Sequence, residues 1–127
     1  MVTMKKLIVD VDMTLTKGKG EKGYEDAIVN RDLVEKIKEY KAMGFSIVLN
    51  TSRNMNSYNN NVGLINKKTL PVIINWLEQN EIPYDEIYVG KPWCGHEGFY
   101  IDDKAIRPSE FINMSYNEII ELLRKEK

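Results

Sequence analysis

The chain has 127 residues, which leaves room for one domain with one modest hydrophobic core. Its 18 basic and 19 acidic residues give a formal net charge of -1, and no Lys/Arg run resembles a nucleic-acid-binding stripe, so we expect no nucleic acid partner. Asp10 interrupts the first apolar stretch and no other span approaches membrane length, so we expect neither a signal peptide nor a membrane partner. A single cysteine excludes an intramolecular disulfide, and a cytoplasmic location fits best.

The first half of the chain predicts a β-helix-β unit. A buried strand is expected over 6–11, and a helix runs from an Asn30 cap to Gly44, with apolar residues at helical spacing. A second strand follows over 45–50. Because both strands are almost entirely apolar, we expect a parallel sheet covered on both faces, with a right-handed crossover. The Gly- and Lys-rich excursion 15–29 between strand and helix is either a mobile surface loop or a hairpin over the mouth of a site.

The second half predicts further elements of the same kind. Segment 53–68 is polar and irregular, and is either a substrate-contacting loop or an asparagine-rich surface loop. A helix is expected over about 70–80, with Pro71 in its first turn and Asn80 at its end. The remaining expected elements are a strand over 86–89, a loop over 90–98, a fourth strand over 99–102, and a last helix that begins with a capping box at Ser115.

Polar side chains follow the expected strands in four patches. They are Asp10, Asp12 and Thr14 after the first strand, Thr51 after the second, Lys91 after the third, and Asp102 and Asp103 after the fourth. Open α/β sheets bind their ligands at the carboxyl ends of the strands. The four patches therefore predict one site at one edge of the sheet.

The residue types in these patches suit phosphoryl chemistry. Of two carboxylates two residues apart at a strand end, Asp10 and Asp12, one could attack while the other moves protons. With Asp102 and Asp103 they would supply oxygen ligands for Mg²⁺. A phosphate dianion needs such a cation, and Lys91, to approach four carboxylates. The Thr51 hydroxyl could donate to a phosphoryl oxygen.

The four patches, in this order, resemble the motif signature of the haloacid dehalogenase superfamily of phosphohydrolases. The resemblance implies that Asp10 is the nucleophile that forms an aspartyl-phosphate and that Asp12 is the general acid/base. It also implies that Thr51 binds the phosphoryl group and Lys91 stabilises the intermediate. Mg²⁺ would be held by Asp10, the Asp12 carbonyl and one or both of Asp102 and Asp103. Met13 departs from the pattern, because many members have glycine there.

A closer resemblance covers 50–55, 89–96 and 98–108. These segments look like short, capless phosphatases encoded among bacterial capsule and surface-polysaccharide genes. The resemblance says little about the identity of the substrate, which we expect to be a small phosphorylated metabolite: a sugar phosphate, a nucleotide-linked precursor or another compound. Candidate substrate-binding residues are Thr14, Ser52, Arg53 and Asn54. Arg53 would either contact substrate or support a neighbouring site residue, and the alternative is a surface ion pair.

Other readings of the same residues stay open. A phosphoacceptor receiver domain also combines an acidic cluster, Mg²⁺, a hydroxyl and a lysine on a parallel sheet, but its lysine comes last. A catalytically silent scaffold of the same fold is a third reading. A dehalogenase is less favoured, because Asp12 suits proton transfer to an oxygen leaving group. Cys94 and His96 cannot fill a tetrahedral zinc site unaided.

We therefore expect a single three-layer α/β/α Rossmann-like domain over residues 1–127, with a mainly parallel sheet and no full cap domain. Its expected activity is that of an Mg²⁺-dependent phosphomonoesterase. Either the excursion 15–29 and the loop 53–68 gate the site, or a neighbouring subunit does, which would make the protein a homo-oligomer.

Overall fold

We describe the protein from a computed structural model, which describes residues 4–126. The chain forms two compact units, one ending at Trp93 and the other beginning at Cys94. The single domain expected over 1–127 includes residues 1–3 and 127, which lie outside the described part. Within 4–126, no helix has both the length and the apolar character needed to cross a membrane.

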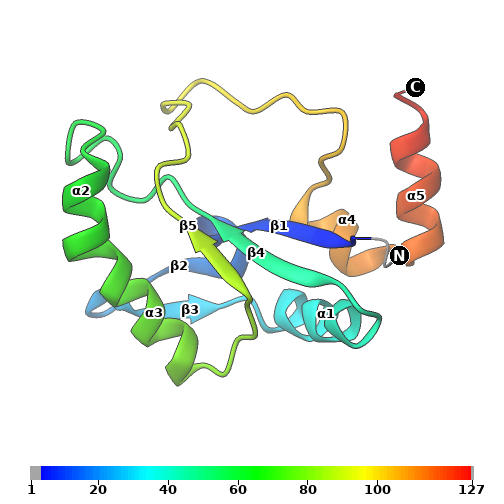
Figure 1. Cartoon of the computed structure of the whole chain (residues 1–127), viewed down its shortest axis with the longest axis horizontal. Coiled ribbons are helices and arrows are strands. Elements are labelled where there is room, and N and C mark those ends of the chain that lie inside the picture. The colour runs from blue at the N-terminus through cyan, green and yellow to red at the C-terminus, as the bar shows by residue number, and fades with distance from the viewer. Residues whose placement is uncertain (1–3, 127) are drawn as a thin grey trace. The chain divides into compact units, whose positions relative to one another are not determined.

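The first unit is built on a parallel three-stranded sheet (Figure 1). Its strands β1 (Lys6–Asp10), β4 (Ser46–Asn50) and β5 (Glu86–Tyr88) lie in the order β1-β4-β5. The register places Asp10 beside Asn50, and Asn50 beside Tyr88. The carboxyl ends of all three strands therefore share one edge. The strands predicted over 6–11, 45–50 and 86–89 are confirmed, with ends that differ by one residue, and so is the parallel pairing of the first two.

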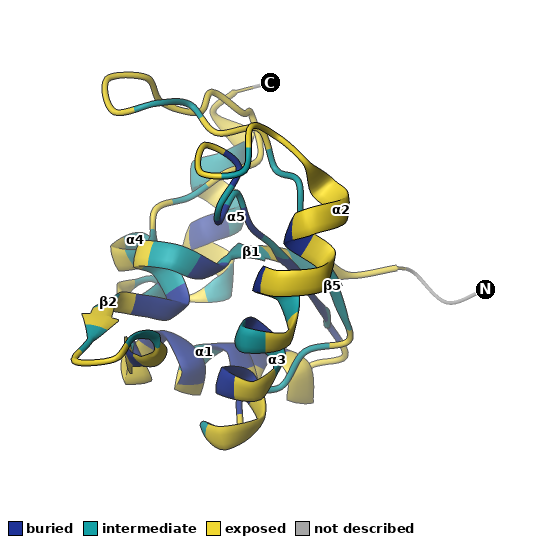
Figure 2. Ribbon diagram, turned by 90° about the vertical axis from the view of Figure 1, so that its left-hand side faces the viewer, coloured by how far each residue is buried: buried dark blue, intermediate teal, exposed yellow. Residues whose placement is uncertain are grey.

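Helix α1 (Arg31–Ala42) connects β1 to β4, as predicted. The Asn30 side chain caps it by accepting a hydrogen bond from the Leu33 amide at 3.3 Å. Gly44, with φ of 98°, takes the left-handed conformation that lets the chain leave the helix. One side of α1 is buried and the other exposed (Figure 2), and the buried residues are Leu33, Val34, Ile37 and Tyr40.

The excursion after β1 contains an antiparallel hairpin of β2 (Thr16–Gly20) and β3 (Gly23–Val29), which confirms the hairpin interpretation. Gly20 is required at its tip, because a Cβ there would collide with the Asp26 carbonyl. The indole of Trp76 donates to the Ala27 carbonyl at 2.9 Å. This buried hydrogen bond ties the hairpin to helix α3 (Leu70–Gln79).

The helical segment before β5 begins earlier than predicted. It runs through α2 (Val62–Leu64), a π-helical turn (Ile65–Thr69) and α3 (Leu70–Gln79). The expected irregular segment thus ends seven residues early, at the Asn61 cap, whose side chain accepts from the Leu64 amide at 3.1 Å. The predicted helix over about 70–80 is confirmed as α3, with Pro71 in its first turn and Asn80 at its end. Pro71 follows the π turn, where the Leu70 amide donates to the Ile65 carbonyl. Proline has no amide hydrogen to donate, and the wider π turn lies directly before it.

The fourth strand predicted over 99–102 is wrong, because these residues form no regular secondary structure. The Phe99 and Ile101 side chains are 77% and 89% exposed. A strand requires a hydrogen-bonded neighbour, and the ladders among the described residues are those of β1 with β4, β4 with β5, and β2 with β3. An apolar run in sequence is therefore not enough to define a strand.

The second unit contains two short helices, α4 (Pro108–Asn113) and α5 (Tyr116–Arg124). The predicted capping box of α5 is confirmed. The Ser115 hydroxyl accepts from the Glu118 amide at 3.2 Å, and the Glu118 carboxylate accepts from the Ser115 amide at 2.8 Å. Phe111 and Ile119 are the buried apolar residues of the two helices.

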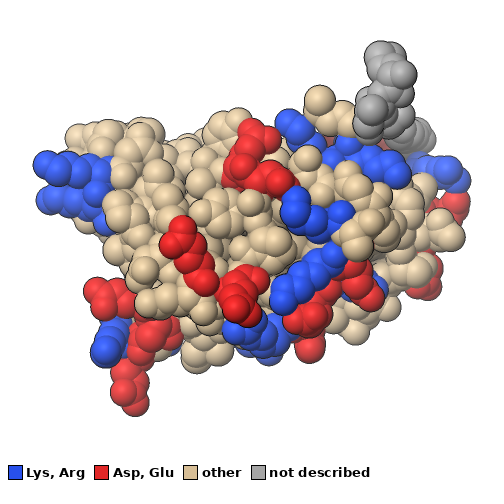
Figure 3. Space-filling model, turned by 60° about the horizontal axis from the view of Figure 1, so that its bottom comes forward, with Lys and Arg blue, Asp and Glu red and all other residues tan. Residues whose placement is uncertain are grey.

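The first unit is thus an α/β structure with a parallel sheet and helices, consistent with a Rossmann-like fold. Its core is formed by apolar residues of the strands and helices, among them Ile47, Leu49, Ile73, Trp76 and Leu77. Acidic and basic side chains are interspersed over the described face that Figure 3 shows.

Candidate active site

The loop after β1 places two carboxylates at the carboxyl edge of the sheet. Asp10 is the last residue of β1, and the backbone of Asp12 is extended, with φ of -73° and ψ of 132°. Met13 then turns the chain with φ of 62°. The Asn30 side chain donates to the Thr14 carbonyl at 3.1 Å, and the Asn30 amide to the Leu15 carbonyl at 2.7 Å. The start of α1 therefore holds this loop in place.

Asp10 is paired with the predicted lysine. The Lys91 Nζ lies 3.5 Å from Asp10 Oδ1, and the Thr14 hydroxyl donates to Asp10 Oδ2 at 3.2 Å. The Lys91 amide donates to the Thr51 carbonyl at 3.1 Å, which fixes the lysine backbone beside the end of β4. Three of the four predicted patches thus meet at the ends of β1, β4 and β5.

Burial raises the pKa of the Asp10 carboxyl above its ordinary value. The Lys91 ammonium and the Thr14 hydroxyl counteract the increase, whereas the Asp12 carboxylate adds to it. The Lys91 ammonium therefore favours the ionised form of Asp10 against the effect of burial. A bound cation would favour that form further.

Asp12 is held by Arg53 through both carboxylate oxygens. Arg53 Nε lies 3.0 Å from Oδ2 and Nη2 lies 2.6 Å from Oδ1, a bidentate arrangement. The Arg53 side chain is only 2% exposed. The alternative that Arg53 forms an exposed surface ion pair is therefore wrong: it does form an ion pair, but a buried one with the predicted acid/base.

The remaining terminal nitrogen of the Arg53 guanidinium, Nη1, is buried and has no hydrogen-bond partner among the described residues. The ring of Tyr24, from strand β3, lies over the guanidinium, with 3.9 Å from Cζ to the ring centroid. This contact brings the hairpin to the carboxylate site. The sequence analysis did not single out Tyr24, although it is the only aromatic residue in the excursion 15–29.

Thr51 and the two residues after it organise the end of β4. Thr51 is 1% exposed, and its hydroxyl accepts from the Arg53 amide at 3.1 Å. The Ser52 carbonyl accepts from the Met55 amide at 3.0 Å and closes a turn. These bonds hold the backbone at Arg53, whose side chain contacts Asp12.

Asn54, a predicted substrate-binding residue, contacts the helical segment that follows. It has φ of 63°, and its Oδ1 accepts from the Thr69 hydroxyl at 2.7 Å. The side-chain oxygen of Asn54 thus fastens the loop after β4 to the π-helical turn. Asn54 therefore has a structural contact that its position in the motif did not predict.

The fourth patch belongs to the second unit. Asp102 and Asp103 are exposed, and Asp102 Oδ1 accepts from the Lys104 amide at 2.8 Å. This hydrogen bond, from a backbone amide to the side chain of an aspartate two residues earlier, forms an Asx turn. Cys94, also in this unit, is a half-buried free thiol. Within residues 4–126 there is no group of three or more His, Cys, Asp or Glu residues placed to hold a metal ion.

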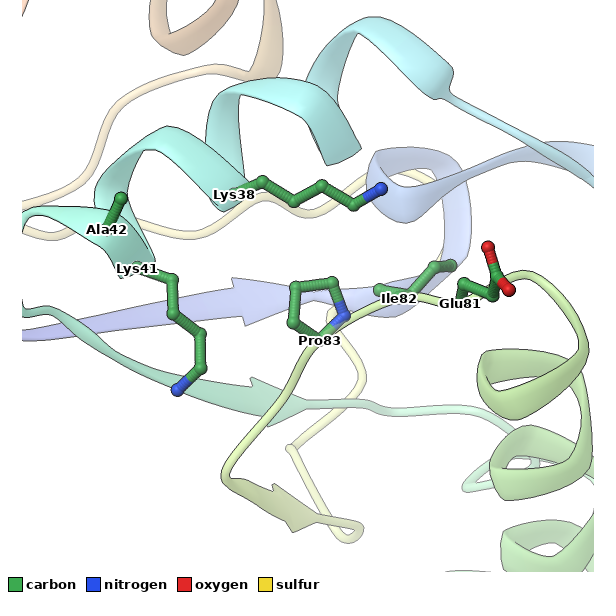
Figure 4. A pocket seen from close by; sticks show the side chains of 6 residues that line it. All are labelled: Lys38, Lys41, Ala42, Glu81, Ile82 and Pro83. Carbon is green, nitrogen blue, oxygen red and sulfur yellow. The ribbon is translucent and has the colours of Figure 1, made fainter.

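A separate hollow of about 480 Å³ lies at the other end of the strands (Figure 4). Residues Lys38, Lys41 and Ala42 of α1 line one side, and Glu81, Ile82 and Pro83 line the other. These two segments lead into the amino ends of β4 and β5. The hollow is therefore distinct from the edge where Asp10 and Asp12 lie.

The fold and the site together define an α/β protein with a Rossmann-like parallel sheet and two carboxylate–cation pairs at its carboxyl edge. A crystal structure of an MCSG target from Vibrio cholerae superposes on it with a TM-score of 0.94. The two sequences are 55% identical, and the match covers 98% of this chain and 100% of that one. The chain belongs to the same protein family as this Vibrio cholerae protein. No family model matches the chain, and no curated protein matches it.

Proposed function

We propose that the protein is an Mg²⁺-dependent phosphomonoesterase of the haloacid dehalogenase type that works through a phosphorylated Asp10. The observation that carries this proposal is the pairing of Asp10 with Lys91 beside the pairing of Asp12 with Arg53. Two carboxylates two residues apart thus have different partners, which supports different roles for them. The proposal includes the three-layer α/β/α fold of that superfamily.

In the proposed reaction, an Asp10 oxygen attacks the phosphorus and the bond to the substrate oxygen breaks. Asp12 gives its proton to the departing oxygen and becomes a carboxylate. Asp12 then takes a proton from a water molecule whose oxygen attacks the phosphorus. This second step releases inorganic phosphate and restores the Asp10 carboxylate. Lys91, 3.5 Å from Asp10, would offset the negative charge that builds up on the acyl phosphate.

The donors at the end of β1 suit Mg²⁺, because Asp10 and Asp12 offer only oxygen atoms there. Asp10 and the Asp12 carbonyl would hold the ion, and the superfamily resemblance implies one or both of Asp102 and Asp103 as further ligands. When bound, Mg²⁺ would neutralise charge on the phosphoryl oxygens. The Thr51 hydroxyl would donate to one of those oxygens, and Thr14, Ser52, Arg53 and Asn54 are the proposed substrate-binding residues.

The proposed substrate is a small phosphorylated metabolite, for example a sugar phosphate used in capsule or surface-polysaccharide synthesis. The hairpin supports a small substrate, because Tyr24 covers Arg53 beside the carboxylates.

Hydrolysis of p-nitrophenyl phosphate and of a panel of phosphorylated metabolites, with Mg²⁺ and after chelation by EDTA, tests the proposal. We expect turnover with Mg²⁺, loss of turnover with EDTA, and recovery when Mg²⁺ is restored. Asp10→Asn, purified in the same way, controls for contaminating phosphatases. Turnover that survives chelation, or that is equal in Asp10→Asn, would contradict the proposal.

A further inference from the structure

We infer that Tyr24 is a positioning residue, which holds Arg53 by stacking on its guanidinium and through Arg53 aligns Asp12 for proton transfer. The inference rests on the proposed function, because Asp12 is the proposed acid/base. It assigns a role in the site to the β2–β3 hairpin.

Arg53 is held from three directions. The Thr51 hydroxyl accepts from its amide at 3.1 Å, Asp12 binds one edge of its guanidinium, and Tyr24 lies over the face at 3.9 Å. The first two contacts fix the backbone and the edge of the planar group. The stacked ring adds a restraint on rotation of the plane, and a rotation would move both donors away from Asp12.

The unpartnered nitrogen makes this ring contact important. A buried guanidinium nitrogen without an acceptor is costly, and Nη1 has no acceptor among the described residues. The face of an aromatic ring offers favourable electrostatics to a guanidinium and is worth more when water is excluded. Tyr24 therefore supplies part of the stabilisation that a hydrogen bond to Nη1 would otherwise give.

The ring is itself anchored. Tyr24 lies on β3, and three residues further along that strand the Ala27 carbonyl accepts the 2.9 Å hydrogen bond of the Trp76 indole. Lys19, on the facing strand β2, has its Nζ 4.7 Å from the Tyr24 ring centroid. The hairpin and helix α3 thus place the ring, and the ring places Arg53.

Two substitutions separate stacking from bulk. Tyr24→Phe keeps the aromatic face and removes the hydroxyl, whereas Tyr24→Leu keeps much of the apolar bulk and removes the face. Arg53 contacts Asp12, so loss of alignment should act on the proton-transfer step. We expect kcat to fall about tenfold in Tyr24→Leu, with KM changed less than about threefold, and both to stay near wild type in Tyr24→Phe. Glu25→Ala, an exposed neighbour on β3, is the matched control.

A second measurement does not depend on activity. The ring current of Tyr24 should displace the NMR signal of the Arg53 Nε–H group, which is assigned by its disappearance in Arg53→Lys. We expect this signal to move in Tyr24→Leu and to stay near its place in Tyr24→Phe. If wild-type protein hydrolyses no phosphomonoester, the proposed function fails while the NMR comparison still tests the stacking.

Two outcomes would overturn the inference. The first is wild-type kcat in folded Tyr24→Leu, measured beside active wild-type protein, which would show that the ring does not align Asp12. The second is an equal fall in kcat in Tyr24→Phe and Tyr24→Leu, which would assign the effect to the hydroxyl. Should Tyr24→Leu fail to fold, Tyr24→Met replaces it, and an unchanged Nε–H signal there would equally contradict the stacking.

Discussion

Lys91 Nζ lies 3.5 Å from Asp10 Oδ1, although the two residues are 81 positions apart in the chain. The pairing joins the end of β1 to the chain that follows β5. It places one positive charge beside the carboxylate proposed to attack phosphorus. The surroundings of Asp10 raise its pKa in spite of that charge, mainly through burial.

Asp10→Asn should therefore separate activity from stability. An amide is a far poorer nucleophile than a carboxylate, so turnover should fall at least about a thousandfold. The folded state holds the Asp10 proton more tightly than the unfolded state, so ionisation of Asp10 costs stability once the pH exceeds its raised pKa. Without metal and at pH 7, we expect the thermal midpoint of Asp10→Asn to equal or exceed that of wild type.

The pH dependence of the difference in thermal midpoint between Asp10→Asn and wild type checks this prediction. As the pH falls through the raised pKa toward the ordinary value, Asp10 becomes protonated in the folded protein and the advantage of asparagine should shrink. Thermal unfolding in EDTA at several pH values between about 4 and 7 measures it. A stability advantage of Asp10→Asn over wild type that grows as the pH falls would contradict this prediction.

Asp85→Asn is expected to lower stability at neutral pH. The Asp85 carboxylate binds Lys41 Nζ at 2.8 Å and accepts from the Ile47 amide at 2.8 Å. Both contacts lower the pKa of Asp85, and the contact with Lys41 has the larger effect. Because the side chain is 39% exposed, solvent screening limits the loss to about 0.5–1 kcal/mol.

A lowered pKa contributes stability above the ordinary value of an aspartate, and that contribution is lost as the pH falls through the lowered value. The gap between wild type and Asp85→Asn in urea unfolding should therefore be constant from pH 5 to pH 7, on the order of 0.5–1 kcal/mol, and close at lower pH. Lys41→Met is the reciprocal variant, and its combination with Asp85→Asn should be less than additive.

Met13→Gly should stabilise the loop after β1. Met13 has φ of 62°, a left-handed conformation that costs a residue with a Cβ about 1 kcal/mol relative to glycine, and its side chain is 70% exposed, so little packing is lost. We expect an increase in unfolding free energy of up to about 1 kcal/mol by urea titration. Met43→Gly, at a residue with negative φ at the end of α1, should destabilise. A Met13→Gly protein less stable than wild type would show that the loop conformation differs in solution.

The elements best predicted from the sequence are those with local signals. The helix after Asn30 and the capping box at Ser115 combine a side-chain cap with an apolar periodicity, and both are confirmed. The apolar runs of β1 and β4 also predicted their parallel pairing. Residues 99–101 carried the same apolar signal but form no strand, because pairing depends on a neighbour that a single segment does not define.

The site was predictable as far as its motifs reach. Motif order indicated Asp10, Asp12, Thr51 and Lys91, and the structure brings these residues together at the ends of three strands. The contact of Tyr24 with Arg53 was not predictable, because it depends on how the hairpin turns over the sheet. Nor did the Asn-rich run reveal that Asn61 begins a helix, since its neighbours have the same composition.

The lifetime of a covalent intermediate separates the phosphatase from a receiver-like switch. Asp12 lies two residues beyond Asp10 and its carboxylate is held by Arg53, so a base remains beside the acyl phosphate after the alcohol has left. A phosphatase should turn over a good substrate at about 1–10³ s⁻¹. In rapid-quench experiments with labelled substrate and Mg²⁺, we expect a hydroxylamine-sensitive label that decays as fast as steady-state turnover. In Asp12→Ala, formation or decay of the label should become limiting, whereas Glu25→Ala should behave as wild type. A receiver domain retains its phosphoryl group, whereas this site, with Asp12 in place, should hydrolyse it. A label that forms on wild-type protein from acetyl phosphate and lasts for minutes without product would therefore favour the receiver-like switch.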